Sequence, residues 1–435
     1  MSTPSRLLIS SSPPQRAFVV GVKGAAVAMD VVVERCAGVD VHQAQVTVCV
    51  RAPGAGEGRV EELASFGTTT PDLLALADWL AGRGVTQVAM EGTGVYWKPV
   101  YYVLESSFEL WLVNAQHVKN VPGRKTDTKD AAWLCRLLEH GLLRKSFVPP
   151  REIRELRDLT RYRKALIRER VSEINRLHKV LEDAGVKLSS VASDVMGVSG
   201  RRMLDALVAG TADSAALADL AKGRLRAKLP QLRKALDARF RGHHAFLVGQ
   251  ILAHIDYLEE AIDTVNGRVE EAIAPFHAAV AVLTSIPGIQ RRTAEVVIAE
   301  IGIDMTRFAT SRHLASWAGL CPGNNESAGK RKHGHTTKGS PWLRTALVEA
   351  ALGATRRRGY LRSKYWRVRG RRGHQRAVIA VAHATLEIIH HLLATGELYT
   401  DLGADYFDRR QTQQLTRRAV RQLERLGHHV TLQPA

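Results

Sequence analysis

Four carboxylates in the first third of the chain have types and positions that could do chemistry together: Asp40, Glu91, Asp127 and Asp130. Asp40 lies within a run rich in β-branched residues, 31–50, and such runs predict β-strands. An ionised carboxylate is costly to bury in a sheet unless a partner compensates its charge. The position of Asp40 therefore indicates either a functional site or the solvent-exposed face of an edge strand.

The other three carboxylates stand at the ends of predicted elements. Glu91 follows a predicted strand at 86–90 and precedes Gly-Thr-Gly. Asp127 and Asp130 are three residues apart at the start of a predicted helix, so they share one face. Individually, Asp127 suits a helix N-cap and Asp130 suits the helix dipole. As a set, on a basic protein, the four predict a site for one or two Mg²⁺ ions that leaves positions open for phosphate.

A serine in the last third of the chain is a second candidate. Residues 324–339 contain almost nothing apolar, which predicts an exposed loop, and Ser327 lies within it. A serine hydroxyl is a poor nucleophile unless a base, cations or a metal assist it. Three cations follow closely and could hold a phosphate: Lys330, Arg331 and Lys332. The same composition is also typical of a plain linker.

The charge of the chain indicates a polyanionic partner. Lys and Arg number 62 against 43 Asp and Glu, a net charge of +19, which favours nucleic acid over a membrane surface. Residues 356–376 hold ten Lys or Arg and no acid, interleaved with aromatic residues that could stack on bases. The alternative is a solvated charged face. The candidate nucleic-acid contacts in this run are Arg369, Arg371 and Arg372.

Composition also limits the cellular setting. No apolar run reaches the roughly 18 residues of a membrane span, so we expect no membrane partner. The four cysteines are scattered without a Cys-x-x-Cys pair, which argues against a zinc ribbon and fits a reducing cytoplasm. We therefore expect a bacterial cytoplasmic, nucleoid-associated protein. Residues 1–32 are expected to be a disordered leader or an over-extended start that precedes the first strand.

With 435 residues, the chain is expected to form two or three domains. Residues 33–150 show three leading strands and then alternating helix and strand, which predicts a mixed α/β sheet. Residues 151–275 predict a helical coiled-coil stalk, because apolar residues recur at spacings of three and four from Val248 to Val269. The stalk could pack on itself or on a second subunit. Residues 276–400 predict a third, helical domain, and residues 401–435 a peripheral tail.

Several of these motifs together resemble the IS-one-ten family of insertion-sequence transposases, also called DEDD transposases. The acidic set resembles that family's tetrad in three segments: Gly38–His42, Met90–Trp97 and Lys125–Ala131. The third domain is similar to the family's C-terminal domain in four segments: Ser285–Ile289, Ala315–Gly323, Ser327–Lys330 and Lys338–Arg344. The resemblance spans about residues 33–393, and the order and spacing of the motifs make it specific.

The resemblance implies a fold and a set of partners. The fold would be α/β plus all-α: an RNase H-like (RuvC-like) domain, the stalk, and a helical transposase domain. The tetrad would be Asp40, Glu91, Asp127 and Asp130, and Ser327 would be the nucleophile. The partners implied are donor and target DNA, a noncoding guide RNA and further copies of this chain, as a dimer or tetramer.

We therefore expect a transposase, a DNA recombinase that cuts and rejoins the strands of a mobile element. One alternative is a metal-dependent nuclease or Holliday-junction resolvase in which Ser327 plays no part. Another, from a different class, is a noncatalytic nucleic-acid-binding protein whose carboxylates are structural. Loss of cleavage in Ser327→Ala separates the first two alternatives. Chelation separates the third, because nucleic-acid binding by a noncatalytic protein should not need Mg²⁺.

Overall fold

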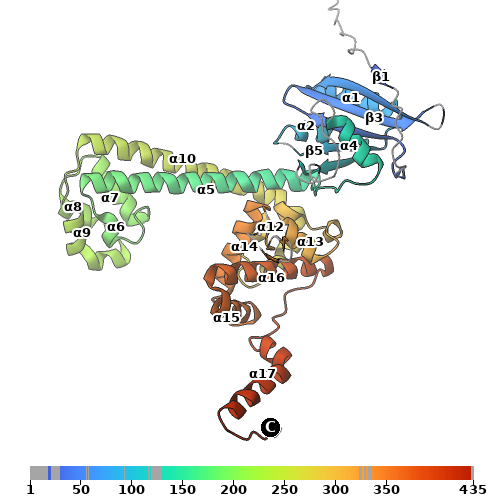
Figure 1. Cartoon of the computed structure of the whole chain (residues 1–435). Coiled ribbons are helices and arrows are strands. Elements are labelled where there is room, and N and C mark those ends of the chain that lie inside the picture. Colours follow the sequence, from blue (N-terminus) through green and yellow to red (C-terminus); the bar gives the residue numbers. More distant parts are fainter. Residues whose placement is uncertain are drawn as a thin grey trace, which may run out of the picture. The chain divides into compact units, whose positions relative to one another are not determined.

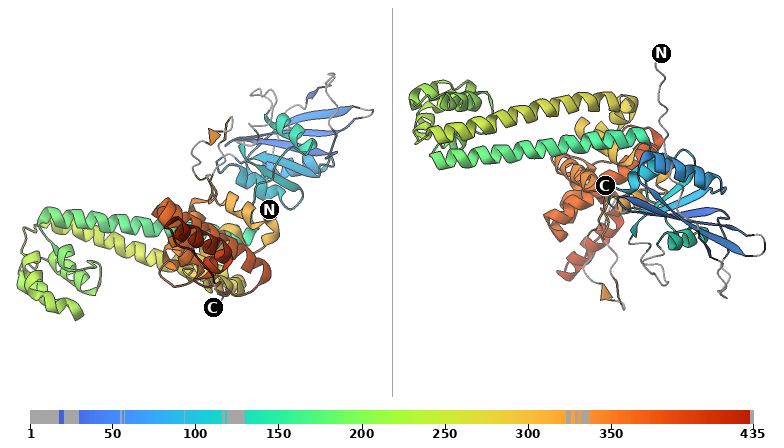
Figure 2. Two further views of the ribbon diagram at one scale, coloured as in Figure 1. Left: turned by 60° about the horizontal axis from the view of Figure 1, so that its bottom comes forward. Right: turned by 90° about the horizontal axis from the view of Figure 1, so that it is seen from above.

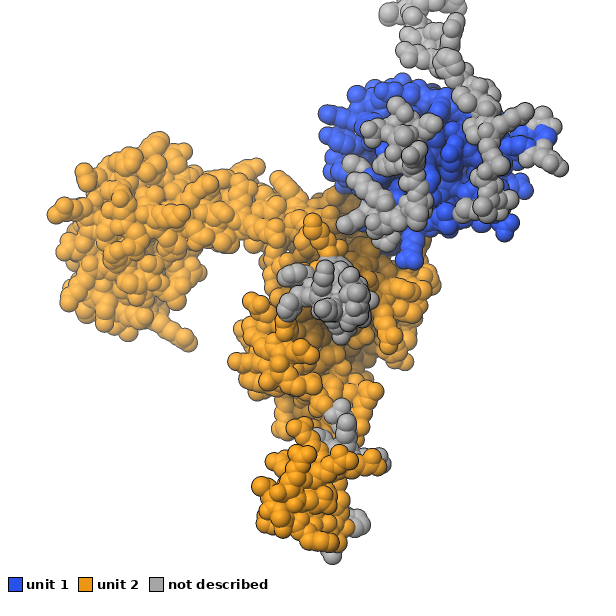
Figure 3. Space-filling view, viewed as in Figure 1, with its two compact units in different colours: residues 1–148 blue, residues 149–435 orange. Residues whose placement is uncertain are grey.

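The computed structural model describes residues 18–20, 30–54, 56, 58–92, 94–115, 118, 130–322, 326–327, 330–331, 336 and 338–432. The chain forms two compact units, which are shown in different colours in Figure 3. Unit 1 is Met1–Val148 and unit 2 is Pro149–Ala435. The predicted boundary between the first domain and the stalk, at residue 150, lies close to this division.

Unit 1 is built on one mixed sheet, as its alternating pattern predicts (Figure 1). Its strands are β1 (Phe18–Val20), β2 (Cys36–Val41), β3 (Gln45–Pro53), β4 (Arg59–Gly67), β5 (Gln87–Glu91) and β6 (Glu109–Val113). They lie in the order β1-β4-β3-β2-β5-β6. The pairs β1–β4, β4–β3 and β3–β2 are antiparallel, whereas β2–β5 and β5–β6 are parallel.

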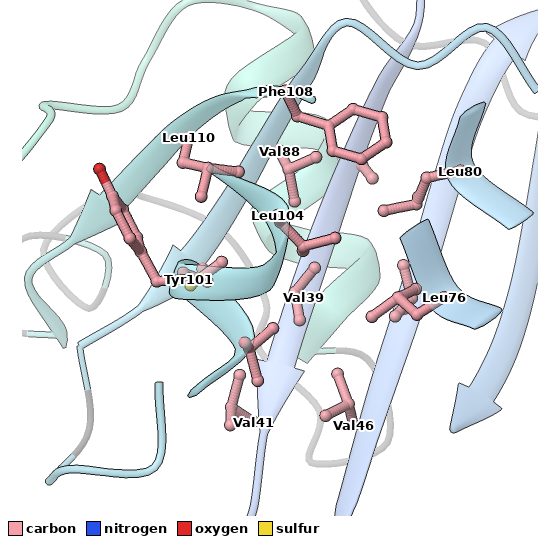
Figure 4. Close-up of a cluster of buried hydrophobic side chains, with 14 of the residues drawn as sticks. Val39, Val41, Val46, Leu76, Leu80, Val88, Tyr101, Leu104, Phe108 and Leu110 are labelled. Carbon is pink, nitrogen blue, oxygen red and sulfur yellow. The ribbon is translucent and has the colours of Figure 1, made fainter. Parts of the chain in front are cut away.

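Helices cover both faces of this sheet. On one face, α1 (Thr70–Ala81) and α2 (Trp97–Leu104) pack on alternate residues of the strands, including Val39 and Val88 (Figure 4). On the other face, α4 (Asp130–Glu139) packs on the residues between them, such as Ala89. Because side chains alternate across a strand, the segments of β2 and β5 that are buried on both faces, Cys36–Val39 and Val88–Met90, contain no polar side chain.

Part of the predicted leader belongs to the sheet. Phe18–Val20 forms β1 and pairs antiparallel with Glu61–Leu63 of β4, so these three residues extend the edge of the sheet. Residues 1–17 and 21–29 lie outside the described residues. At residues 32 and 33, two backbone N–H groups donate to the carbonyl oxygen of Glu139 at the end of α4.

Unit 2 begins with two long helices that pack against each other, α5 (Arg151–Ala184) and α10 (Gly242–Ile273) (Figure 2). The predicted apolar positions of α10 are buried or half-buried, among them Val248, Ile255 and Val269. In α5 a seven-residue spacing from Ile153 to Leu181 also predicts a seam, and its positions are buried or half-buried. The stalk therefore packs on itself within one chain.

Short helices between α5 and α10 close a separate core. They bury Leu188, Met203 and Leu232 against the facing parts of the two long helices. The elements are α6 (Leu188–Val191), α7 (Val198–Val208), α8 (Ser214–Asp219), η2 (Gly223–Lys228) and α9 (Leu229–Leu236). This part of the predicted stalk is thus a small helical bundle rather than a continuous pair of helices.

The rest of unit 2 is helical and centres on α16 (His374–Thr395), which contacts α11, α13, α14 and α15. Among the described residues, α16 alone is long and apolar enough to cross a membrane, but half of its apolar window is buried in the protein. Its composition therefore follows from its place in the core. The elements are η3 (Ala274–Phe276), α11 (His277–Thr284), α12 (Arg291–Ile301), η4 (Met305–Arg307), α13 (Ser311–Trp317), β7 (Glu326–Ser327), β8 (Lys330–Arg331), α14 (Pro341–Ala354), α15 (Tyr360–Arg372), α16 and α17 (Tyr406–Arg425).

Candidate functional site

Two of the predicted carboxylates lie at or next to the ends of neighbouring parallel strands. In the pairing of β2 with β5, Val39 lies opposite Met90, so Asp40 and Glu91 are the next residue on each strand. Val39 and Met90 are both buried in the core beneath α1 and α2. Because side chains alternate across a strand, Asp40 and Glu91 face the opposite side of the sheet, where α4 lies.

A close contact between α4 and β2 brings the third carboxylate to the same face. A side-chain carbon added at Gly38 would lie 2.1 Å from the carbonyl oxygen of Ala131 and 2.4 Å from the backbone nitrogen of Cys135. Only glycine leaves room for the α4 backbone here. Asp130 is the first residue of α4, next to Ala131. Asp40 lies two residues beyond Gly38, about 7 Å along the strand.

Asp40, Glu91 and Asp130 thus share one face at one end of the sheet, while Asp127 lies outside the described residues. Oxygen donors of this kind are the ligands that Mg²⁺ prefers. Within the described part of the chain, however, no three His, Cys, Asp or Glu side chains are grouped closely enough to hold a metal ion. The donor chemistry suits Mg²⁺, and the described carboxylates alone do not form its ligand set.

A histidine that sequence reasoning missed contacts the first carboxylate. Nε2 of His42 lies 3.2 Å from Oδ2 of Asp40, and the side chains are 70% and 27% exposed. The signal was present in the sequence, since residues two apart on a strand share a face. Asp40 is therefore partly open to solvent and has a polar neighbour, which removes the cost expected for a buried, unpaired carboxylate.

Ser327 lies in a short hairpin rather than in an irregular loop. β7 and β8 pair antiparallel, with Ser327 opposite Lys330, so two residues separate them at the turn. The loop is closed at its base by a bridge between Pro322 and Thr336. The side chains of Ser327, Lys330 and Arg331 and all of Lys332 lie outside what the structure describes, so their predicted roles stay predictions.

The chain that follows this hairpin is held tightly. A side-chain carbon at Gly339 would lie 2.3 Å from the carbonyl carbon of Ala318, so the loop end packs directly on the end of α13. Ser340 then caps α14 by accepting the N–H of Leu343 at 3.2 Å, as the Ser-Pro signature predicts. Oγ of Ser340 also donates to Oε2 of buried Glu300 at 2.8 Å. The loop that carries Ser327 is thus anchored at its C-terminal end.

The turn Ser285–Ile289 also has a close contact. Gly288 has φ +89°, and a side-chain carbon there would lie 2.1 Å from the carbonyl oxygen of Ala350. Packing on α14 and a left-handed backbone therefore explain the glycine. Backbone N–H groups at a helix–glycine–helix turn can also bind phosphate, but the glycine at this position is explained without such a contact.

The basic run forms α15, and its aromatic residues divide into two kinds. Trp366 is 51% exposed, and the guanidinium of Arg369 lies 4.7 Å from the centre of its ring. Tyr365 is buried and its hydroxyl pairs with Nδ1 of His374 at 2.8 Å. The expectation that Tyr365 could stack on bases is therefore wrong, because this side chain packs inside the domain.

Three arginines near the end of α15 remain available to a partner. Arg369, Arg371 and Arg372 are exposed, as predicted for nucleic-acid contacts. By contrast, burial lowers the pKa of Lys364 on the same helix, because the charged ammonium is poorly hydrated there. The helix thus presents arginines and Trp366 outward and draws Lys364 and Tyr365 toward the core.

A sheet with carboxylates at its strand ends, together with exposed arginines on α15, favours a protein that acts on nucleic acid. Residues 37–185, which include most of the sheet and α5, match a family model of DEDD type described as "Transposase". Residues 280–367 match a second model, "Transposase IS116/IS110/IS902 family". Together the two models match more than half of the chain, and the chain belongs to this family of insertion-sequence transposases.

Curated relatives agree with this assignment. The "Insertion element IS110 uncharacterized 43.6 kDa protein" of Streptomyces coelicolor is 34% identical over 131 residues, 29% of this chain and 32% of the relative. The match thus spans about a third of that relative. The "Transposase for insertion sequence element IS1328" of Yersinia enterocolitica is 26% identical over 64% of this chain and 73% of the relative. The "Insertion element IS116 uncharacterized 44.8 kDa protein" of Streptomyces clavuligerus is 26% identical over 67% and 80%.

Proposed function

We propose that this chain cuts and rejoins the DNA strands of its insertion sequence, with a carboxylate site on the sheet and Ser327 as nucleophile. The observation that carries the proposal is the shared face of Asp40, Glu91 and Asp130 at adjacent strand ends and a helix start. Residues that do chemistry are often placed at the ends of rigid elements, because a packed scaffold fixes their positions. Asp127, three residues before Asp130, completes the set.

We further propose that unit 1 is RNase H-like. Three antiparallel strands, β4, β3 and β2, followed by two parallel ones, β5 and β6, support this assignment. Asp40 and Glu91 then lie on the adjacent interior strands β2 and β5, where the antiparallel part of the sheet meets the parallel part. Mg²⁺ held by the four carboxylates would neutralise charge on the scissile phosphate.

The nucleophilic step is a phosphoryl transfer to serine. Oγ of Ser327 attacks the scissile phosphorus, its proton leaves to a base, and the phosphorus–oxygen bond to the neighbouring nucleotide breaks. The departing oxygen takes a proton and becomes a hydroxyl. The result is a DNA strand joined to Ser327 through a phosphodiester, which a hydroxyl of the partner strand later attacks in the same way. Cations beside the hairpin would stabilise the charge that develops on phosphate.

The partners of this reaction are donor DNA, target DNA, a noncoding guide RNA and further copies of the chain. The net charge of +19 and the exposed arginines of α15 support nucleic-acid binding. The α5–α10 pair offers a long surface for a second subunit, and we propose a dimer or tetramer in which the serine of one subunit serves the carboxylates of another. The reaction takes place on nucleoid DNA in the bacterial cytoplasm.

The test compares three proteins on element-end DNA in the presence of Mg²⁺. After denaturation, the wild type should carry covalently attached DNA, and Ser327→Ala should carry none. Asp40→Asn should lose cleavage but bind nucleic acid within a few fold, because Asn keeps the shape and removes the charge that a cation needs. Full cleavage by Ser327→Ala would instead establish the metal-only nuclease, and Mg²⁺-dependent cleavage by Asp40→Asn would refute the carboxylate site.

Mixing the two inactive variants tests whether the site is shared between subunits. Ser327→Ala and Asp40→Asn should partly restore each other, since some mixed sites then contain both intact parts. A site built within one chain cannot be restored in this way, because every chain lacks one component. The mixture must be shown to form hetero-oligomers, for example with two affinity tags, before absence of rescue counts against the shared site.

A further inference from the structure

A pocket of about 280 Å³ opens between α5, α12 and α14, within unit 2. Ile167 and Val296 supply apolar surface to it, and Trp342 from the first turn of α14 is half-buried beside them. Five cations also line it: Arg161, Arg163, Lys164, Arg168 and Arg292. The volume lies at the lower end of small-molecule sites, so the pocket has room for one ring system rather than for a base pair.

Most of these cations already have carboxylate partners, and two do not. Arg161 is fixed by a two-pronged ion pair with buried Glu300, and Lys164 pairs with Glu349. In the described part of the chain, Arg168 and Arg292 line the pocket, are exposed and form no ion pair. The pocket therefore presents two uncompensated positive charges at its rim.

Trp342 is the aromatic surface of this pocket. The guanidinium of Arg168 lies 5.0 Å from the centre of its ring, and that of Arg161 lies 5.7 Å away. Arg161 is held in place by its carboxylate, whereas Arg168 is held by the ring alone. A cation–π contact at an exposed site is worth only about 0.5–1 kcal/mol, so an incoming aromatic ring can replace Arg168 at little cost.

We propose that this pocket binds one unpaired nucleotide of a nucleic-acid strand. The base stacks on Trp342 against Ile167, and Arg168 swings outward to join Arg292 on the phosphate. Unstacked bases are recognised by aromatic side chains and guanidinium planes, and their phosphates by arginine. The residues that line the pocket include neither the four carboxylates nor Ser327. It rests on the proposed function only in its choice of nucleic acid as ligand.

The test measures binding by fluorescence anisotropy with two labelled probes, an oligothymidylate of about 10 nucleotides and a fully paired duplex of the same length. Stacking on one aromatic residue is worth about 1–3 kcal/mol, so Trp342→Ala should weaken binding of the single strand by about 5- to 150-fold. Duplex binding should change by less than about twofold. Trp342→Phe should keep most of the affinity for the single strand, because it keeps an aromatic face.

Arg168→Gln tests the phosphate contact without touching the core, since this side chain is exposed. It should lower the slope of log affinity against log salt by about 0.7 for the single strand. Two controls are matched to these changes: Tyr257→Ala removes an aromatic side chain that is 63% exposed on α10, and Lys179→Gln removes an exposed cation on α5 outside the pocket. Both should bind the single strand like the wild type.

A crosslink gives an independent reading. An oligothymidylate that carries one 4-thiothymidine should attach to the α14 peptide containing Trp342 after irradiation, and Arg168→Gln should reduce the yield. The proposal is overturned if Trp342→Ala binds the single strand like the wild type, if it weakens both probes equally, or if the crosslink maps elsewhere. None of these measurements needs strand cleavage, so failure of Ser327 as nucleophile would leave them unchanged.

Discussion

Replacing Glu300 with glutamine should loosen the junction of α5, α12 and α14. The Glu300 side chain is 1% exposed and accepts two hydrogen bonds from Arg161, at 2.8 and 2.9 Å. It also accepts the hydroxyl of Ser340 at 2.8 Å. Arg157 strengthens the same junction by donating to the backbone carbonyl oxygens of Ala299 and Glu300. One carboxylate thus connects three helices that come from distant parts of the sequence.

The magnitude follows from burial and charge. Removing one partner of a buried ion pair costs about 3–5 kcal/mol, because the other charge is left uncompensated. Glutamine keeps one carbonyl acceptor, and the Arg161 side chain is 35% exposed, so water restores part of its hydration. We therefore expect Glu300→Gln to destabilise the junction by about 2–3 kcal/mol. Glu300→Ala should reach the upper end of the range.

Hydrogen exchange read by mass spectrometry is the suitable assay, because unfolding of a chain with two units is not a single transition. Peptides that cover α12 and α14 should exchange about 30- to 150-fold faster in Glu300→Gln. The matched control is Glu349→Gln, whose partner Lys164 lies 3.2 Å away with both side chains exposed by a third or more. That exposed pair is worth about 0.2–1 kcal/mol. Equal protection in the two variants would refute the reasoning.

Three further changes test other parts of the structure. Gly38→Ala should destabilise unit 1 by several kcal/mol and lower its unfolding temperature, because the added carbon would meet the α4 backbone; an unchanged melting curve would contradict the close packing. A variant with glutamine at three exposed residues of α15, Arg369, Arg371 and Arg372, should bind duplex DNA with a weaker dependence on salt. Each lost phosphate contact should reduce the slope of log affinity against log salt by about 0.9. In the α7–α10 contact, a hydrogen bond from Arg201 lowers the pKa of Asp256. The Arg201–Asp256 pair therefore contributes fully to stability above about pH 3.9, the pKa of Asp in the unfolded chain. This contribution is lost as pH falls through the lower pKa that Asp256 has in the folded protein. Acid unfolding of Arg201→Gln should show a smaller loss over that interval, and an identical acid profile would argue against the contribution.

Local signals in the sequence predict much of the fold. Alternation and β-branched runs predict the strands of the mixed sheet apart from β1, which lies in the expected leader, and the spacing of apolar residues predicts α10 with its buried positions. The Ser340-Pro341 pair predicts the start of α14, because capping depends on residues within one turn. The positions of Asp40 and Glu91 near strand ends are likewise properties of short segments. Each of these features depends on neighbours in sequence, which is why the sequence alone suffices.

Only the tertiary structure decides which distant segments meet. That α4 crosses β2 at Gly38, and so carries Asp130 to the face of Asp40, depends on the packing of a helix against a sheet formed by residues far apart in the chain. The same holds for Tyr365. Its residue type predicts a ring that could stack on bases, but the fold buries this side chain. Glu300 and Trp342 gain their roles from α5, more than a hundred residues away. Periodicity specifies which face of an element is apolar, but burial and charge pairing depend on the partner that covers it.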